Sequence, residues 1–383
     1  MNQTFMDYFL QTVNQYESLK NMMVALGPSG SWYLALGAML LLAVVMTGVL
    51  AGIGGFGTYA ERKISADIQG RLGPNRVGPY GLFQLLADGI KMISKEDIAP
   101  NTADKAMFYF APFLCIFGVV STFAVLPVSS GLTLSHLNVG IFYLVAISSL
   151  VGLGIFLAGY ASNSKWSMLG GMRGASQIVS YEIPVTLSII SVVLITGGLS
   201  FKEVLAMQGG LPHQWLVFHN PFLFIAFFIF FVGMLAETNR APFDLPEAES
   251  ELVSGYHTEY TGIRFGLFAL AEYMEVFVVC SVAASLFLGG YLVPFEIGGE
   301  GPLGQFLQVL IFLGKGAALY YTVIWIRWTF PRLRVDQLMT LCWKYLTPIA
   351  IFNLVGCSVW MVLFNGRSLL QILGSISFGG GGH

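Results

Sequence analysis

Six long stretches of this 383-residue chain contain no Asp, Glu, Lys or Arg. They cover residues 21–60, 106–164, 183–201, 204–236, 276–295 and 345–366. A helix needs about 20 mostly apolar residues to cross the hydrocarbon core of a bilayer, and each stretch supplies at least most of one. Because the stretches are continuously apolar and do not alternate, they predict helices and not the strands of a membrane barrel. We therefore expect an all-α protein that crosses a membrane several times.

The composition excludes several classes of protein. Only 10% of the residues are charged, against about 25% in a soluble domain, so a secreted enzyme, a nucleic-acid-binding protein and a disordered chain are excluded. The four cysteines form no CxxC pair, and the five histidines avoid the centres of the apolar stretches. We therefore expect no metal site and no redox cofactor in this chain. Residues 1–20 lack the pattern of a cleaved signal peptide.

The charge pattern predicts eight transmembrane helices in one membrane domain, residues 34–365, between an N-terminal external segment, 1–33, and a C-terminal tail, 366–383. The helices are expected near residues 34–57, 107–127, 139–160, 179–199, 220–237, 264–289, 304–327 and 342–364. Fifteen of the 19 Lys and Arg residues lie in or beside the loops 58–106, 161–178, 238–263 and 328–341. The positive-inside rule makes these loops cytoplasmic, with both termini on the external, periplasmic side.

Residues 80–97 form an amphipathic pattern within the first of these loops. Five apolar residues share one face at helical spacing: Leu82, Phe83, Leu86, Ile90 and Ile93. This pattern predicts a helix that lies in the membrane interface. The helix is either a plain surface helix or the lining of an entrance for a lipophilic molecule.

Gly52–Gly57 reads GIGGFG, a formal GxGxxG motif. The motif binds dinucleotides only between a strand and a helix, and here it lies inside an apolar span. We therefore interpret these glycines as sites of close helix packing.

A cationic segment rich in Gly and Pro, residues 69–81, follows the first expected span. Arg62 precedes it, and Arg71 and Arg76 lie within it. Such a sequence favours a rigid loop over a helix or strand. It is either an anchor for lipid headgroups or the wall of a docking or binding site.

The connection 236–260 carries six carboxylates against the single arginine Arg240. Charge pairing inside the segment cannot neutralise them. If residues 246–253 are helical, Glu247 and Glu251 share a face. Like-charged carboxylates in a partly buried place raise each other's pKa, which allows them to hold and pass protons. The alternative is a solvated acidic loop.

Five ionisable residues lie within or at the ends of the expected spans: Glu182, Glu237, Glu272, Glu275 and Lys315. A charge at the bilayer centre costs on the order of 2.5–3.5 kcal/mol. A structural ion pair between Lys315 and one glutamate would explain one or two of these residues, but not all five. The set therefore favours an intramembrane proton or ion path.

The chain resembles the family of the H membrane subunit of NADH:quinone oxidoreductase (respiratory complex I) over residues 33–365. The resemblance rests on Glu61–Gly81, on the string ETNRAPFDLPEAESELVSG within 236–260, on FGLFALAEY at 265–273 and on IRWTFPRLRVDQL at 326–338. It implies a membrane subunit that forms the quinone chamber at the junction with the peripheral arm. It also implies that the subunit begins the proton path that couples quinone reduction to ion translocation.

The resemblance implies two sets of residues. The quinone chamber and its entrance would include Arg62, Arg71, Arg76, Asp88, Phe268, Arg327, Arg332 and Arg334. The proton path would include Tyr181, Glu182, Glu237, Asp244, Glu247, Glu249, Glu251, Glu272 and Tyr273.

The resemblance also implies the chain's surroundings. Quinone, as ubiquinone or menaquinone, would be the substrate, and FMN and iron–sulfur clusters would belong to partner subunits. The partners would be the peripheral-arm subunits at the quinone site, the small membrane subunits that lead to the antiporter-like subunits, and the lipid of a bacterial inner membrane.

Two other functions remain open on the sequence. One is the membrane subunit of an energy-converting nickel–iron hydrogenase, and the other is a stand-alone carrier, which the lack of an internal repeat disfavours. The sequence leaves open the quinone type, the electron donor, H⁺ or Na⁺ as the coupling ion, and movement of the acidic loop. It assigns no role to the first 30 and last 10 residues.

Overall fold

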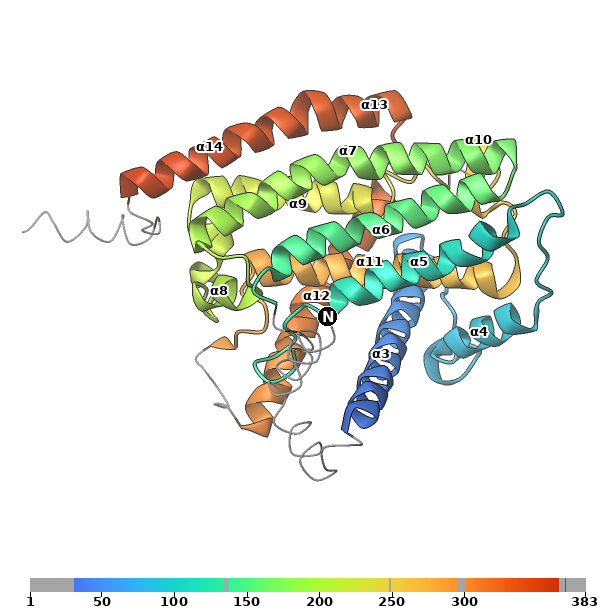
Figure 1. The fold of residues 1–383 in the computed structure, drawn as a ribbon, viewed down its shortest axis with the longest axis horizontal. Coiled ribbons are helices and arrows are strands. Elements are labelled where there is room, and N and C mark those ends of the chain that lie inside the picture. The colour runs from blue at the N-terminus through green and yellow to red at the C-terminus, as the bar shows by residue number, and fades with distance from the viewer. Residues whose placement is uncertain are drawn as a thin grey trace, which may run out of the picture. The chain divides into compact units, whose positions relative to one another are not determined.

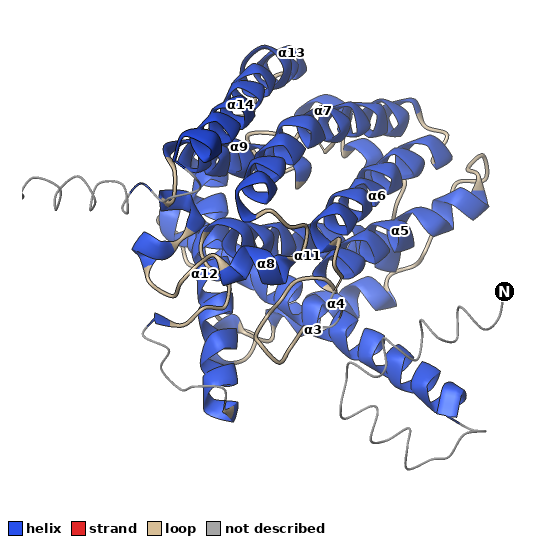
Figure 2. Ribbon diagram, turned by 60° about the vertical axis from the view of Figure 1, so that its left-hand side comes forward, coloured by secondary structure: helices blue, strands red, loops and turns tan. Residues whose placement is uncertain are grey.

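The computed structural model describes residues 31–133, 135, 137–247, 249–294, 301–364 and 369. Within these residues the structure is helical and contains no strand (Figure 2). The expected N-terminal segment 1–33 and C-terminal tail 366–383 lie almost wholly outside the described residues. The chain divides into two compact units, residues 1–52 and 53–383. All the side chains discussed below belong to the second unit.

Seven helices of the described residues are long and apolar enough to cross a membrane. They are α3 (Ser31–Ile68), α5 (Lys105–Phe123), α6 (Gly140–Ala161), α7 (Lys165–Thr196), α11 (Gly262–Phe287), α12 (Pro302–Thr329) and the run 335–364. This run consists of α13 (Val335–Thr340), a π-helical segment (Leu341–Leu346) and α14 (Thr347–Phe364). An all-α polytopic membrane protein is therefore confirmed.

The remaining expected span, the fifth along the chain at 220–237, corresponds to α9 (Pro221–Glu237), an apolar helix of 17 residues. At 1.5 Å per residue it is about 25 Å long, shorter than the hydrocarbon core of about 30 Å. The count of eight spans and the orientation of the termini stay predictions.

Three helices extend beyond the spans expected from the charge pattern. α3 continues to Ile68, α7 already begins at Lys165, and α13 begins at Val335. Much of the loops expected at 161–178 and 328–341 is therefore helical. Charged residues mark the expected edge of the hydrocarbon, whereas the backbone hydrogen bonds of a helix continue past that edge into the polar region.

The second unit is a set of closely packed helices. α5, α6 and α7 lie side by side, and α14 packs along α7 and α9 (Figure 1). α6 and α7 meet at glycines, since a Cβ built on Gly159 would lie only 2.9 Å from the Cα of Gly171.

Glycines of the GxGxxG motif also pack closely, with Gly54 against Met274 of α11 and Gly57 against Tyr320 of α12. The interpretation of this motif as a packing feature is confirmed for Gly54 and Gly57, whereas a Cβ on Gly52 would meet nothing of the described residues within 4 Å.

α11 is the most buried of the candidate spans. It packs against α5, α9 and α12 and carries Glu272, Tyr273 and Glu275.

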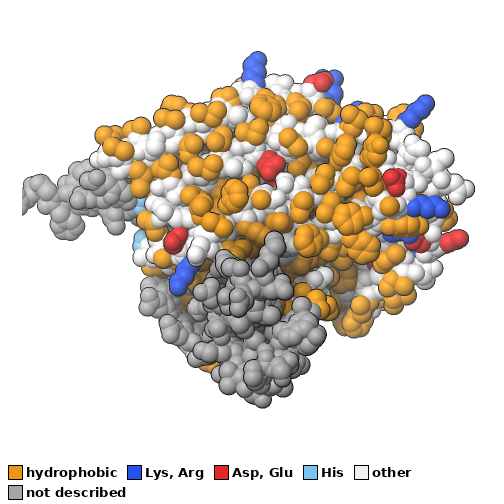
Figure 3. Space-filling view, viewed as in Figure 1, with side chains coloured by type: hydrophobic (Ala, Val, Ile, Leu, Met, Phe, Trp, Pro, Cys, Tyr) orange, Lys and Arg blue, Asp and Glu red, His pale blue; other side chains and the backbone are white. Residues whose placement is uncertain are grey.

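The four cysteines, Cys115, Cys280, Cys342 and Cys357, are all buried and form no disulfide. The surface is different: apolar side chains cover most of the described face in Figure 3, and Lys and Arg side chains lie toward its edges.

Short helices fill the connections. They are α4 (Gln84–Ser94), α8 (Phe201–Ala206), α10 (Glu249–Leu252) and the 3₁₀ turns η1 (Pro79–Gly81), η2 (Pro212–Gln214), η3 (Leu216–Phe218) and η4 (Gly255–His257). α4 confirms a helix within residues 80–97. Its apolar residues Leu86, Ile90 and Ile93 are exposed, so the apolar face of α4 is not covered by the described parts of this chain.

Candidate functional site

The candidate site is built around the turn that ends α9. The backbone N–H of Arg240 donates to the carbonyl of Leu235 at 3.2 Å, and Asn239 adopts a left-handed conformation with φ of +50°. Asn accepts this conformation more readily than most residues. The turn therefore reverses the chain directly after Glu237 and directs Arg240 back into the protein.

A buried amide on α7 holds this turn in place. Gln177 Nε2 lies 2.7 Å from the carbonyl oxygen of Ala236 and 2.8 Å from that of Phe243. It also lies 3.2 Å from Oδ1 of Asn239. Because buried polar groups are costly when unpaired, Gln177 fixes the backbone on both sides of Arg240.

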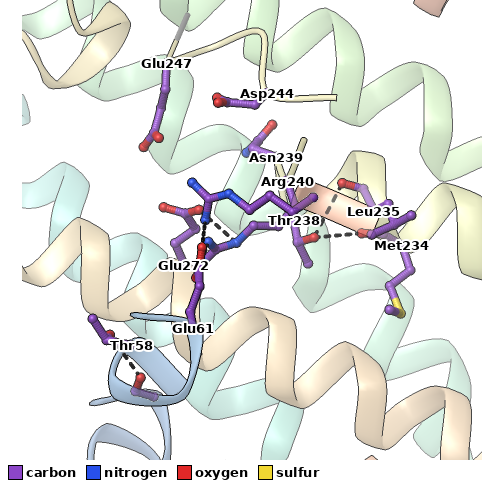
Figure 4. Close-up of polar contacts among 12 residues, drawn as sticks. Thr58, Glu61, Met234, Leu235, Thr238, Asn239, Arg240, Asp244, Glu247 and Glu272 are labelled. Carbon is purple, nitrogen blue, oxygen red and sulfur yellow. Dashed lines mark hydrogen bonds and ion pairs between the residues drawn. The ribbon is translucent and has the colours of Figure 1, made fainter. Parts of the chain in front are cut away.

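Arg240 lies between two carboxylates from different helices. Its Nη1 is 3.1 Å from Oε2 of Glu61 on α3, and its Nε is 3.1 Å from Oε1 of Glu272 on α11 (Figure 4). Arg327 of α12 pairs with the other oxygen of Glu61. The Arg240 guanidinium also lies over the Tyr273 ring, 4.3 Å from its centroid.

Glu61, Arg240, Glu272 and Arg327 form what we call the buried charge cluster. Only 4% of the Arg240 side chain is exposed. Two arginines face two glutamates, so their formal charges cancel. This balance matters because an unpaired charge in such a place carries a large desolvation penalty.

Two carboxylates of the acidic connection pair with arginines from other parts of the chain. Asp244 pairs with Arg332 at 2.9 Å, and Glu251 pairs with Arg173 of α7 at 2.7 Å. Glu247 lies 2.6 Å from Nε2 of His257, within the connection. The expectation that these carboxylates cannot be neutralised held only for the segment alone, because the fold brings arginines from distant positions.

A shared face for Glu247 and Glu251 depended on a helix over residues 246–253. The helix in this region, α10, spans only Glu249–Leu252. Glu247 and Glu251 therefore have different environments and different partners. The side chain of Glu249 lies outside the described residues.

Two acids of the connection have pKa values shifted in opposite directions. Burial and the nearby Glu247 raise the pKa of Asp244 above its usual value, although Arg332 and Arg327 oppose the shift. Burial would also raise the pKa of Glu247, but His257 and the guanidinium groups of Arg240 and Arg327 lower it to about 2. Near neutral pH Glu247 is therefore ionised, and Asp244 is the group easier to protonate.

Further carboxylates lie within electrostatic reach of one another in the helices. Glu182 of α7 acts on Glu237 at the end of α9, and Glu237 acts on Glu275 of α11. Glu272 acts on Glu275 as well and belongs to the buried charge cluster. Electrostatic coupling thus links Glu182, Glu237, Glu275 and Glu272 in series, and we call these four residues the glutamate line.

Lys315 forms no ion pair with these glutamates among the described residues, so the alternative of a structural ion pair at Lys315 is wrong. Its Nζ donates to the carbonyl of Gly290 at 2.9 Å and lies 5.0 Å from the Trp215 ring centroid. α11 runs 12 residues, or about 18 Å, from Glu275 to its end at Phe287. Lys315 therefore contacts the chain beyond the far end of α11 and not the glutamates.

The cationic loop packs on α3 and α4. Arg62 pairs with Asp88 of α4 at 2.5 Å, and the Tyr59 hydroxyl donates to the carbonyl of Tyr80 at 2.9 Å. Gly81 has φ of +80°, and a Cβ there would lie 2.1 Å from the Pro74 carbonyl oxygen. Glycine is therefore required at this close approach.

Phe268 of α11 is buried in an aromatic group. Its ring centroid lies 5.5 Å from that of Tyr256, 5.3 Å from that of His257 and 4.9 Å from that of Tyr260. Phe268 thus joins α11 to the end of the acidic connection.

Two cavities lie elsewhere in the second unit. One, of about 280 Å³, is lined by Ser200, Lys202 and Tyr291 among others. The other, of about 330 Å³, is lined by Asp104, Asn163 and Lys165 among others. Neither cavity is lined by a predicted site residue. The described residues contain no group of three His, Cys, Asp or Glu side chains arranged to hold a metal ion.

A family model described as NADH dehydrogenase matches residues 39–358. The chain belongs to the NADH-quinone oxidoreductase H-subunit family. It is 44% identical to the H subunit of NADH-quinone oxidoreductase from Anaeromyxobacter dehalogenans (strain 2CP-C), over 88% of this chain and 84% of that protein. It is 47% identical to the H subunit from Bacteroides fragilis (strain YCH46), over 78% of this chain and 83% of that protein. "NADH-quinone oxidoreductase subunit 8" of Rhodothermus marinus is 44% identical, over 87% of this chain and 96% of that protein.

The structure brings many of the predicted site residues of this H-subunit family member together. Glu272, Tyr273 and Arg327 belong to or contact the buried charge cluster, and Asp244 pairs with the predicted Arg332. Tyr181 is buried on α7, and its hydroxyl donates to the carbonyl of Leu338 at 3.1 Å.

Three predicted chamber residues, Arg71, Arg76 and Arg334, form no ion pair with the buried charge cluster or the acidic connection among the described residues. Arg71 donates to Gln69 beside it. Arg76 and Arg334 are exposed and take part in no ion pair of the described residues.

The predicted residue sets of the H-subunit family member omit four groups that the structure places at its centre. They are Glu61, Arg240, Glu275 and His257. Arg240 is the one cation of the acidic connection and Glu61 is the first charge after the longest N-terminal apolar stretch. Both positions were signals of function in the sequence. His257 had no such signal, because a single histidine in a loop has no spacing pattern to identify it.

Proposed function

We propose that this chain is the H membrane subunit of a proton-pumping NADH:quinone oxidoreductase. In this role it forms the quinone chamber at the junction with the peripheral arm and the first part of the proton path. The observation that carries the proposal is the buried charge cluster, in which Arg240 joins the acidic connection to Glu61 and Glu272. A change of charge on one side of such a cluster alters the proton affinity of the carboxylates on the other.

The quinone chamber and its entrance form the first part of the proposal. Arg62 and Asp88, which tie the end of α3 to the amphipathic α4, would flank the entrance. The exposed apolar face of α4 supports this position, since it suits contact with lipid and with a lipophilic quinone. The other proposed residues of the chamber are Arg71, Arg76, Phe268, Arg327, Arg332 and Arg334.

The proton path forms the second part. The carboxylates of the acidic connection would respond to charge in the chamber, and the glutamate line would carry the response through the helices. The proposed residues are Tyr181, Glu182, Glu237, Asp244, Glu247, Glu249, Glu251, Glu272 and Tyr273. The electrostatic contacts from Glu182 through Glu237 and Glu275 to Glu272 support this order.

The proposal assigns no redox cofactor to this chain. FMN and iron–sulfur clusters would lie in partner subunits of the complex, and quinone would be the substrate. The chain would lie in a bacterial inner membrane, with the acidic connection on the cytoplasmic side and both termini on the periplasmic side. The concentration of Lys and Arg beside the acidic and cationic loops supports this orientation.

Purification through a tag on this chain in mild detergent tests the proposal. NADH:quinone reductase activity and hydrogen evolution are measured on the same sample. We expect a large assembly that contains flavin and iron–sulfur clusters and reduces quinone. Hydrogen evolution without quinone reduction would assign the chain to an energy-converting nickel–iron hydrogenase. A chain that purifies alone as an active oligomer would instead be a carrier.

A further inference from the structure

His257 stands in an unusual position for a histidine. It ends the turn η4, is almost fully buried and packs between rings, 3.9 Å from the Tyr256 centroid and 5.3 Å from that of Phe265. Its Nε2 lies 2.6 Å from Oε1 of Glu247. Its Nδ1 is buried and has no hydrogen-bond partner among the described residues. One ring nitrogen is therefore committed to a carboxylate and the other is free.

The hydrogen positions follow from this contact. The 2.6 Å contact places one hydrogen between Nε2 and Oε1; because an ionised carboxylate only accepts hydrogen bonds, Nε2 carries that hydrogen and donates it. In the neutral ring Nδ1 then holds an unused lone pair. One added proton converts the ring to imidazolium beside the Glu247 carboxylate. Transfer of the Nε2 hydrogen to Oε1 then leaves a neutral ring protonated at Nδ1 and a neutral carboxyl, so the proton count balances.

The His257–Glu247 pair is electrostatically connected to the buried charge cluster. Arg240 and Arg327 of the buried charge cluster act on Glu247. α7 brings Arg173, which pairs with Glu251, and α6 contains no Asp, Glu, Lys or Arg. The other titratable groups that act on the Glu247 side or on the adjacent Tyr256 are Asp244, Cys115, Glu272 and Glu275. Glu247 of the pair is thus electrostatically coupled both to Asp244 and to Glu272 of α11.

We propose that His257 is a proton-relay residue, which takes up a proton at Nδ1 and passes the Nε2 hydrogen to Glu247. The proposal rests on the proposed function, because it gives the proton path of this subunit a specific step. It assigns to Glu247 the role of the acceptor within the acidic connection. It also requires His257 and Glu247 to act as one unit.

The test uses the whole complex in inverted membrane vesicles. His257→Gln keeps a side-chain N–H for Glu247 but has no group that titrates, and His257→Asn is a second such variant. His219→Gln is the matched control, because His219 also has a buried Nδ1 without a partner among the described residues but forms no ion pair there. NADH:ferricyanide activity reports assembly. Proton pumping per quinone reduced is measured as a function of pH, between about pH 5 and 8.

We expect His257→Gln to lower proton pumping on the order of tenfold or more and to remove one limb of its pH profile. Glu247→Gln should remove the same limb, and the double variant should be no worse than the worse single variant. His219→Gln should keep the unmodified profile. Unmodified pumping and an unmodified profile in an assembled His257→Gln complex would overturn the proposal. If neither His257 variant assembles, a pH limb that survives in Glu247→Gln overturns it.

The outcome for the relay is separable from the outcome for the proton path. If Glu182→Gln and Glu272→Gln retain full pumping, the proposed path fails and the relay fails with it. If those two variants lose pumping while His257→Gln retains it, the path stands and only the relay is wrong.

Discussion

Glu61 and Arg240 lie 179 positions apart in the sequence, and their side chains meet at 3.1 Å in a buried site. The contact joins the end of α3 to the turn after α9. The turn after α9 fixes the backbone of Arg240, and hydrogen bonds from Gln177 of α7 to this turn keep the turn in place. A charge change at Glu61 therefore acts on a side chain whose backbone cannot readily move away.

Removal of the Arg240 charge should destabilise the subunit severely. Arg240→Gln leaves Glu272 without its arginine and Glu61 with Arg327 alone, and loss of one partner from a buried pair costs about 3–5 kcal/mol. We expect strongly reduced assembly, measured as NADH:ferricyanide activity and as intact complex on native gels.

Arg173→Gln is the control for Arg240→Gln. It also breaks an arginine–glutamate pair, but 47% of the Glu251 side chain is exposed. An exposed pair is worth about 0–1 kcal/mol, so assembly should be nearly unchanged. Equal losses in the two variants would contradict the importance given to burial.

The glutamate line should be needed for coupling quinone reduction to proton pumping, but not for the entry of electrons from NADH. Glu182→Gln and Glu272→Gln remove a titratable group each while keeping the side-chain shape. We expect lower NADH:quinone turnover and proton pumping, with NADH:ferricyanide activity unchanged. Glu203→Gln, at an exposed position of α8, keeps a side chain that can cap the helix and should behave as the unmodified protein. Parallel loss of all activities in the Glu182 and Glu272 variants would instead indicate an assembly defect.

The Arg62–Asp88 pair should affect quinone access. Arg62→Ala or Asp88→Leu separates α4 from the end of α3 and should raise the apparent KM for quinone, measured with a short-chain and a long-chain quinone. Lys91→Ala is the matched variant, because Lys91 is exposed and lies 3.9 Å from the same carboxylate. An unchanged KM in the Arg62 and Asp88 variants would remove both residues from the entrance.

The pKa of Asp244 gives a prediction with a definite sign. Burial and Glu247 raise this pKa, and Arg332 lowers it, so Arg332→Gln should raise it further. Asp244 then holds its proton to a higher pH, and the limb of the activity profile that Asp244 controls should move in the alkaline direction. The measurement is quinone reductase activity against pH, with Lys344→Gln as an exposed control of equal charge change. A shift toward acid would contradict the assignment.

The contact of α6 with α7 should tolerate no added methyl group. Gly171→Ala would place a Cβ 3.0 Å from the Cα of Gly159, and overpacking of this kind costs about 1–3 kcal/mol. Gly314→Ala on α12 meets nothing within 4 Å and should be neutral or stabilising by up to about 1 kcal/mol. The temperature at which each complex loses activity measures the difference. A Gly171→Ala complex as heat-resistant as the Gly314→Ala complex would contradict this packing.

The sequence predicts the helices well because their signal is local. Charge-free stretches identify the spans, and α4 follows from a spacing of three and four residues. Helix ends are predicted less well, as α7 shows, because charge marks the edge of the lipid and not the end of the hydrogen-bonded backbone.

The ion pairs of the site could not be predicted from spacing. Arg327 meets Glu61 across 266 positions, and no local pattern contains that information. Counting charges in the acidic connection alone therefore gives six carboxylates against one arginine, whereas the fold supplies Arg173 and Arg332 to two of them. Lys315 shows the same limit, since the sequence left open an ion pair with a glutamate, whereas Lys315 donates to a backbone carbonyl.

The burial of Cys115, Cys280, Cys342 and Cys357 has a practical consequence. A thiol reagent in water has no native target on the described parts of this chain, and the full sequence contains no other cysteine. A single cysteine placed on an exposed position, such as Lys344 or Lys202, therefore provides a unique chemical handle. Membrane-impermeant reagents applied to right-side-out and inverted vesicles would then report on which side of the membrane each loop lies.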